Sequence, residues 1–489
     1  MFPQIKNSIG NLSFQLLYNG SADGMEVKQT TEHIVDHQFL PALEQLLDKH
    51  STADEVITID KMECNITIGG SELNDALVKK IMAQLEKQLL DRGTPARDGD
   101  VKPLSLHERY IKTLLFYFKN GHLPWWATIA SKKELNEMVL NLAEAEVQSA
   151  DSNELLILLR TENVVLRICN DLEDEAFWEV LKLMPFYSRN ISAIETWKKD
   201  YIMFTAETYL SSDSIYFPLT YKKNILKAFA AIGTPALAGQ AVELNELFAN
   251  FLATEELRHL PVELINKISD PLLKARLKFI EAQKGQIDQQ SEEKKNIKSN
   301  EAPETNQQKK KPKAEDEEGD DNKLNLEAVY INNCGLVIIA SYLGMFFNKL
   351  GLVRDGKITD ATRAVTLLHY IASGNTAFAE FEVILPKLLC GVDIKDAVKS
   401  KYAITAGDAE EVDGLLKAVI ANWTVLKNTS PDGLRSAFLM RDGKLSFKGN
   451  SYHLQVQEQA IDVLMQHLPW NISMIKLSWM KHLLIVDWM

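Results

Sequence analysis

Apolar residues recur at helical spacing through most of the chain, and strand-like alternation is confined to its two ends. Near the N-terminus, residues 8–20 and 56–70 alternate in the manner of strands, whereas residues 30–50 and 71–90 carry apolar side chains along one helical stripe. Residues 1–100 are therefore expected to form a small α+β unit.

The pattern turns helical at Ser105 and stays helical to residue 282. The stretches SLHE and SKKE, which begin at Ser105 and Ser131, have the spacing of capping boxes, and Gly121 is expected to end the first of these helices. No sequence repeat relates these helical segments to one another. A regular solenoid is therefore a possible interpretation of this region that the sequence does not support. Further helices are expected at residues 153–168, 172–183, 221–231, 242–251 and 273–283.

Residues 283–322 contain no aromatic and almost no aliphatic side chain, and they include the basic run KKKPK followed by the acidic run EDEEGDD. Such a segment cannot bury enough apolar area to offset the conformational entropy that folding removes. Residues 283–324 are therefore predicted to be a disordered, charged linker.

Residues 325–489 are predicted to form a compact module that begins with helices and ends in short strands. The Gly449-Asn450 pair predicts a hairpin, and the stretches ISMIKLSWM and LLIVDWM have the composition of strands. The helices are expected at residues 335–350, 360–373, 380–390 and 408–426.

The expected fold class is α+β and mainly α-helical. It comprises the small unit over residues 1–100, a helical region over residues 101–282, the linker over residues 283–324 and the C-terminal module over residues 325–489. Whether the helical region packs with the small unit is left open.

Composition narrows the classes of function. The net charge of -13 argues against nucleic acid as a general partner, because phosphate binding needs clustered Lys and Arg. The four cysteines lie far apart, which fits a reducing cytoplasm, and the N-terminus does not have the pattern of a signal peptide. The apolar stretch at residues 335–347 is shorter than the roughly 20 residues of a spanning helix. It is predicted to be a buried core helix, so no stable membrane insertion is expected.

The sequence gives little reason to expect catalysis. His33 and His37 have the i, i+4 spacing of two metal ligands on a helix, but Ile34 stands where a zincin motif has Glu, and no third ligand is evident. Two exposed histidines are the preferred interpretation. Phosphate-binding glycine loops and a GxSxG elbow are absent from the sequence. We therefore expect a non-enzymatic protein without a metal or cofactor.

Tryptophan is concentrated in two places, and the tetrapeptide HLPW occurs in both, at residues 122–125 and 467–470. Core packing of a terminal sheet is the interpretation we favour, because large aromatic side chains dominate core energetics. The alternative is an interface, because Trp and Arg concentrate binding energy. The candidate interface residues are Trp125, Trp126, Trp423, Arg435, Arg441, Trp470, Trp479 and Trp488.

Six stretches resemble, in the expected order, the contractile injection system tape measure protein family, which is encoded with phage-tail-like particles in bacteria. They are ITIDKMECNITIG (57–69), GHLPWWA (121–127), TRAVTLLHYIASG (362–374), LPKLLCG (385–391), NWTVLKNTSPDGLRSAFLMRDGKL (422–445) and DVLMQHLPWNISMIKLSWM (462–480).

The resemblance implies a structural protein that takes part in tube assembly or length control and contacts tube, baseplate or other particle proteins. Its expected location is the cytoplasm or the inside of the assembled particle. The alternative is a cytosolic chaperone or adaptor that escorts a particle component or cargo and is absent from the finished particle.

A length ruler works through its contour length, and the sequence does not predict a continuous rod. Wholly helical, the chain would reach about 730 Å, yet its helical patterns run for roughly 20 residues, or about 30 Å. The sequence therefore predicts two folded ends joined by the linker.

Overall fold

The structure is a computed structural model, and its fold is α+β and mainly helical, as the sequence predicts. It describes the single residues 12, 14, 64, 66 and 244, and the ranges 24–50, 55–56, 75–92, 104–127, 129–142, 149–208, 217–232, 246–248, 262–279, 326–398 and 402–488. The predicted linker and most of the predicted N-terminal strands lie outside the described residues.

The chain divides into two compact units. The first comprises Met1–Leu114 and Pro124–Thr128, and the second comprises Leu115–Leu123 and Ile129–Met489. The domain boundaries predicted from the sequence, at residues 100, 282 and 325, remain a proposal about how the chain is organised.

The first unit contains the helical segment predicted at residues 30–50, which is confirmed. It begins as α1 (Gly24–Ile34) and ends as α2 (Leu40–His50), with a π-helical turn at Val35–Phe39 between them. Pro41 follows this turn and has no N–H to donate, which relaxes the regular α-helical bonding just before it.

Ile34, Phe39 and Leu43 form the core of this segment together with Val78 of α3 (Asp75–Arg92). The helix predicted at residues 71–90 is thereby confirmed over the residues that the structure describes. The strands β1 (Glu55–Val56) and β2 (Leu104–Ser105) pair antiparallel, and α4 (Leu106–Asn120) follows directly.

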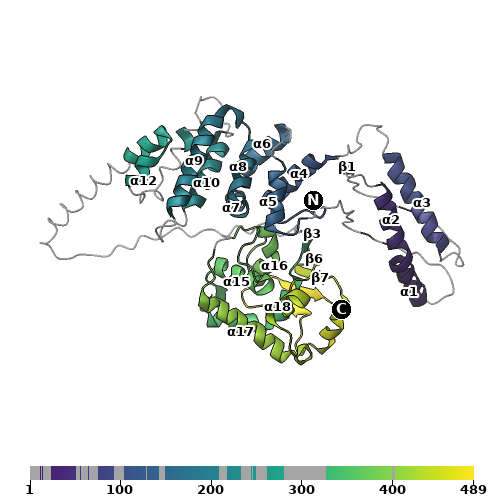
Figure 1. Ribbon diagram of the computed structural model, residues 1–489. Coiled ribbons are helices and arrows are strands. Elements are labelled where there is room, and N and C mark those ends of the chain that lie inside the picture. The colour runs from purple at the N-terminus through teal and green to yellow at the C-terminus, as the bar shows by residue number, and fades with distance from the viewer. Residues whose placement is uncertain are drawn as a thin grey trace, which may run out of the picture. The chain divides into compact units, whose positions relative to one another are not determined.

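The middle of the second unit is a series of short helices (Figure 1). α5 packs on α8, and α10 packs on α7 and α9. Phe177, Trp197 and Tyr221 are fully buried among them. The bounds are α5 (Lys132–Leu140), α6 (Ser149–Leu158), α7 (Glu162–Asp171), α8 (Asp174–Lys182), α9 (Ile191–Thr208), α10 (Phe217–Ile232) and α12 (Val262–Lys267), with a short 3-10 turn at Ser188–Asn190 and further helical residues at 271–279.

One helix prediction in this region is wrong, because residues 153–168 form two helices. α6 ends at Leu158, and Thr161 has an extended backbone (φ -93°, ψ 122°) before α7 begins. Ser and Thr favour such positions before a helix because their side chains compete with regular backbone bonding. The helices predicted at 172–183 and 221–231 are confirmed, whereas that at 242–251 lies largely outside the described residues.

The four helical segments predicted after residue 325 are confirmed, and two of them start as 3-10 turns. These turns are η6 (Cys334–Ile339), which leads into α14 (Ala340–Lys349), and η7 (Glu380–Val383), which leads into α16 (Ile384–Leu389). The other two are α15 (Ala361–Ser373) and α17 (Ala406–Asn422), which is followed by the turn η8 (Thr424–Leu426). The structure adds α18 (Pro431–Leu434), the π-helical turn η9 (Arg435–Leu439) and the 3-10 helix η10 (Ala460–His467), which were not predicted.

Leu336, Val337 and Ile338 are fully buried, which confirms the core interpretation of the apolar stretch at residues 335–347. Among the residues that the structure describes, no helix is both long enough and apolar enough to cross a membrane.

A five-stranded sheet completes the second unit. The order of its strands is β3 (Leu326–Ile331), β6 (Gly443–Lys448), β7 (Ser451–Val456), β9 (Leu483–Asp487) and β8 (Met474–Ile475). A separate small hairpin pairs β4 (Val353–Arg354) with β5 (Lys357–Ile358).

The predicted hairpin at Gly449-Asn450 is confirmed, and both residues have positive φ, as the turn between β6 and β7 requires. β9 lies parallel to β7, a pairing that the sequence did not indicate. Only two residues of ISMIKLSWM form a strand, so that prediction is mostly wrong; β8 pairs through Met474 and Ile475 alone. Leu445, Leu454 and Val486 lie in register on the buried face.

Gly335 and Gly344 offer a matched test of this packing. A Cβ on Gly335 would overlap the carbonyl oxygen of Phe438, whereas a Cβ on Gly344, inside α14, has no neighbouring atom within 4 Å. We expect Gly335→Ala to lower the free energy of unfolding by about 1–3 kcal/mol through overpacking. Gly344→Ala should raise it by about 0.5–1 kcal/mol, because Ala favours the helix. Denaturant unfolding of both variants checks this, and equal effects would contradict the packing around Gly335.

Candidate functional site

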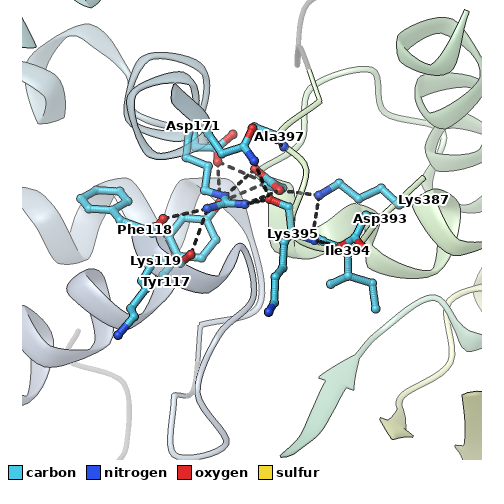
Figure 2. A network of polar contacts seen from close by, with 12 residues as sticks. Tyr117, Phe118, Lys119, Asp171, Lys387, Asp393, Ile394, Lys395 and Ala397 are labelled. Atoms are coloured by element: carbon cyan, nitrogen blue, oxygen red, sulfur yellow. Dashed lines mark hydrogen bonds and ion pairs between the residues drawn. The ribbon is translucent and has the colours of Figure 1, made fainter. Parts of the chain in front are cut away.

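Arg167 of α7 is the centre of a polar network inside the second unit. Figure 2 shows this network, with Tyr117, Asp171 and Lys387 among the labelled residues. Its side chain is buried, and its five N–H groups all have acceptors in the structure. Nε and Nη2 donate to the two carboxylate oxygens of Glu380 at 2.8 and 3.2 Å. Nη1 donates to the carbonyl oxygens of Phe118 at 2.8 Å and Lys119 at 3.3 Å, and Nη2 also donates to the carbonyl oxygen of Lys395.

Glu380 begins the η7 turn and accepts bonds from two buried cations. Besides Arg167, the Nζ of Lys387 donates to Glu380 Oε1 and, at 2.9 Å, to the carbonyl oxygen of Ile394. Glu380 is 2% exposed and Lys387 is fully buried. Burial lowers the pKa of Lys387, and the carboxylate of Glu380 opposes that shift. The pair lies on one stretch of chain, whereas Arg167 reaches it from the middle helices.

Asp171 and Tyr117 extend the network on the side of the middle helices. The hydroxyl of Tyr117 donates to Asp171 Oδ2, and the N–H of Glu380 donates to Tyr117 Oη at 3.1 Å and to Asp171 Oδ2 at 3.3 Å. Burial, and then the charge of Glu380, raise the pKa of Asp171 to about 7. Burial also raises the pKa of Tyr117 well above its ordinary value. Asp171 therefore changes charge near neutral pH.

Gly121 makes room for this arrangement. It follows α4 with φ +78°, and its N–H donates to the carbonyl oxygen of Tyr117 at 2.8 Å, which confirms the predicted helix end. A Cβ on Gly121 would lie 2.8 Å from Arg167 Nη2 and 2.9 Å from Glu380 Oε1. A side chain at this position would therefore displace the ion pair.

A second contact joins the same two parts of the unit. The N–H of Lys132, the first residue of α5, donates to Glu382 Oε2 at 3.1 Å, and the N–H of Ala379 donates to the same oxygen at 2.7 Å. Carboxylates are stabilising at helix N-termini, where backbone N–H groups have no partner within the helix. Ser131 caps α5 as predicted, through a bond from the N–H of Glu134 at 3.3 Å.

We call the five polar side chains of this arrangement the charge network, and all of them are nearly or fully buried. They are Tyr117, Arg167, Asp171, Glu380 and Lys387. A substrate has no access to these groups while the unit is closed. Their arrangement holds the middle helices and the C-terminal module together, since Arg167 and Asp171 belong to α7 and Glu380 and Lys387 to η7 and α16.

Three of the candidate interface residues lie inside the C-terminal module. Arg441 forms a bidentate pair with Asp462, at 2.6 and 2.8 Å, and lies over the ring of Trp488 at 5.3 Å. Trp488 Nε1 donates to Asp462 Oδ2 at 3.1 Å. Trp423 is fully buried beside Phe438. These three residues hold the module together.

Trp470, Trp479 and Arg435 are partly exposed, and each donates to a backbone carbonyl of a helical segment. Trp470 Nε1 donates to Ile338 O at 2.8 Å, Trp479 Nε1 donates to Leu389 O at 2.8 Å, and Arg435 Nε donates to Ile371 O at 3.0 Å. Carbonyl groups in the last turn of a helix have no partner within it, so Trp479 and Arg435 satisfy acceptors at the ends of α16 and α15.

The first HLPW copy lies in a loop after α4, where Trp125 and Trp126 are half-buried and meet edge to face at 5.7 Å. Trp126 Nε1 donates to Thr113 Oγ1 at 3.3 Å, and Arg109 donates to the carbonyl oxygen of Trp126. The candidate residues are thus not gathered at one site, and whether any of them contacts a partner stays a prediction.

His33 and His37 lie on consecutive turns of the first helical segment, with their rings stacked at 4.3 Å and nearly parallel. Both side chains are exposed. Over the described ranges, no group of three or more His, Cys, Asp and Glu side chains is placed to hold a metal ion.

Sequence reasoning missed the charge network. Arg167 and Glu380 are 213 positions apart, and each stands in a segment that looks like an ordinary amphipathic helix. One local signal was present: Lys387 and Glu380 both occur in an otherwise apolar stretch, EFEVILPKLLC, where unpaired charges would be costly.

The raised pKa of Asp171 predicts how stability depends on pH. Between its ordinary value of 3.8 and its folded value of about 7, the folded chain holds a proton that the unfolded chain has lost. Asp171 therefore lowers the free energy of unfolding as pH rises through this window, by about 1.4 kcal/mol per pH unit at most. Asp171→Asn keeps an acceptor oxygen for Tyr117 but removes the charge.

We expect the free energy of unfolding of Asp171→Asn to increase relative to that of the unmodified chain as pH rises from 4 to 7. Denaturant unfolding at several pH values measures this difference. The control is Asp413→Asn, an exposed carboxylate paired with Lys417 on α17, which should leave the pH slope unchanged. Parallel slopes for Asp171→Asn and the unmodified chain would refute the assignment.

The profile of the contractile injection system tape measure proteins matches residues 6–488, nearly the whole chain and parts of both compact units. No curated protein and no solved structure matches the chain. The family indicates a tape-measure-type structural role in a contractile injection system. On the extent of this match, the chain belongs to the contractile injection system tape measure protein family.

Proposed function

We propose that this protein is a non-enzymatic assembly factor of a contractile phage-tail-like particle, and that it acts on tube building as a folded body. Family membership supports the structural role. The charge network supports the folded mode of action, because it joins residues of the middle helices to residues of the C-terminal module inside one compact unit. Nothing in the family match favours the alternative of a chaperone.

The lengths of the helices argue against a rigid helical rod over the described residues. The longest of them, α3 and α9, have 18 residues each, which corresponds to about 27 Å. A chain of 489 residues would need to be helical throughout to reach about 730 Å. If the protein controls tube length, it would therefore do so by assembling in several copies, by docking on other particle proteins or by unfolding, and not as one continuous helix.

The position of the predicted linker bears on the same question. The described residues end at Phe279 on one side and resume at Leu326 on the other, and both flanking parts belong to the second unit. Arg167 and Glu380 join these parts through buried bonds. We infer that residues 280–325 connect two regions of one body, so their length does not set a distance between two separate ends.

The contacts of the chain with the particle are proposed to involve its partly exposed tryptophans. Trp470 and Trp479 of the second unit keep solvent-accessible surface, as do Trp125 and Trp126 of the first, whereas Trp423, Arg441 and Trp488 are buried. The proposed partners are tube or baseplate proteins, with the chain located inside the particle or on its assembly intermediate. Mass spectrometry of purified particles should detect the chain.

Shortening the linker tests the folded-body proposal. Deletion of about 20 residues within 285–320 should leave tube length unchanged in electron micrographs of purified particles. If the length of the linker instead set the length of the tube, the deletion would shorten the tube by up to about 70 Å. Loss of the whole chain is the control, since it should abolish tubes or make their lengths irregular. Shorter, uniform tubes from the deletion would refute the proposal.

A further inference from the structure

The two most exposed large apolar side chains of the described residues, Met345 and Met474, each follow one member of an aromatic pair closely in the sequence. Tyr342 of α14 and Trp470 meet edge to face at 5.2 Å, and both are half-buried. Met345, one helical turn after Tyr342, is 70% exposed, and Met474 of β8, four residues after Trp470, is 67% exposed. Methionine is flexible and polarisable, and it is common at surfaces that adapt to a partner.

The aromatic pair is held in place by bonds to its own module, so it presents a fixed surface. Trp470 Nε1 donates to Ile338 O at 2.8 Å, and Asn422 Nδ2 donates to Tyr342 Oη at 2.9 Å. A preorganised aromatic anchor loses little side-chain entropy on binding. The methionines on either side supply the adaptable part.

The segment that contains Trp470 and Met474 carries an unusual charge for an acidic chain. No Asp or Glu occurs between Asp462 and Asp487, whereas Lys476 and Lys481 occur within that stretch, and both are exposed. Lys476 Nζ donates to Lys481 O at 2.6 Å, which places its charge beside the loop after β8. Asp462 is withdrawn from the surface, because it is buried against Arg441.

The strand β8 lies at the edge of the sheet. Among the residues that the structure describes, it is the last strand and pairs with β9, through Met474 and Ile475. Natural sheets protect such edges with short strands and lysines, or else use them for partners. Here the edge lies between an exposed methionine and a lysine, which favours contact with a partner that complements both.

We propose that Tyr342, Met345, Trp470 and Met474, with Lys476 and Lys481 at the rim, form the surface by which this chain docks on an acidic, apolar-centred face of another particle protein. The inference rests on the proposed function and names the chemistry of its partner. Charge complementarity selects this occupant: a cationic rim around an apolar centre attracts an anionic rim, and repels a cationic one. A second copy of the chain is the competing occupant.

Charge reversal with a matched control tests the proposal. Biolayer interferometry measures binding of the full chain to the purified tube, sheath and baseplate proteins, each alone. The same titrations are made with two double variants, Lys476→Glu/Lys481→Glu and Met345→Ala/Met474→Ala. The control Lys357→Glu/Lys417→Glu makes the same change in net charge at exposed positions on β5 and α17. Circular dichroism establishes that each variant is folded.

We expect one of these proteins to bind the unmodified chain, and the reversal to weaken that binding by about tenfold or more. Binding of the unmodified chain should weaken with added salt, the methionine variant should bind several-fold more weakly, and the control should bind within twofold of the unmodified chain. Equal weakening by the control and the reversal, or binding of none of the particle proteins, overturns the proposal.

Self-association through this face in analytical ultracentrifugation, abolished by Lys476→Glu/Lys481→Glu, would assign the surface to a second copy and also overturn the proposal. The proposed function fails on a different observation, namely unchanged tubes in particles made without the chain. The two failures are therefore distinguishable.

Discussion

The bidentate bond between Arg167 and Glu380 is the interaction on which the rest of the second unit depends. Desolvating a guanidinium and a carboxylate is costly, and the cost is offset only where the remaining donors and acceptors are also satisfied. In this unit the other N–H groups of Arg167 bond to backbone carbonyls, and Glu380 takes a second cation, Lys387. Removing one member of such a group costs about 3–5 kcal/mol, because its partner is left buried and unpaired.

This bond also explains several choices made elsewhere along the chain. Gly121 has no side chain at the point where one would strike both Arg167 and Glu380. Burial, and then the negative charge of Glu380, raise the pKa of Asp171 to about 7. The same contact brings α7 and η7 together, although Arg167 and Glu380 are 213 positions apart.

Features of the fold that depend on neighbouring residues could be predicted from the sequence, and features that depend on distant ones could not. The helices after residue 325 and the hairpin at Gly449-Asn450 follow from local periodicity and turn chemistry, and both are confirmed. The break at Thr161 was missed because the apolar residues on either side continue in helical spacing. The parallel partner of β7 was missed because the composition of a strand does not reveal which neighbour it pairs with. Tryptophan density selected candidate interface residues in the C-terminal module, but burial separates Trp423 and Trp488 from Trp470 and Trp479, and burial is a property of the folded state.

Phe279 and Leu326, the described residues on either side of residues 280–325, belong to the same compact unit. The contacts inside that unit therefore hold the two flanking parts together without relying on the chain between them. A protease cut between Phe279 and Leu326 would leave two fragments that are still joined by the Arg167–Glu380 bond and the helix α5 contact with Glu382. A tag, a fluorophore or a foreign domain inserted between Phe279 and Leu326 would leave these buried bonds in place.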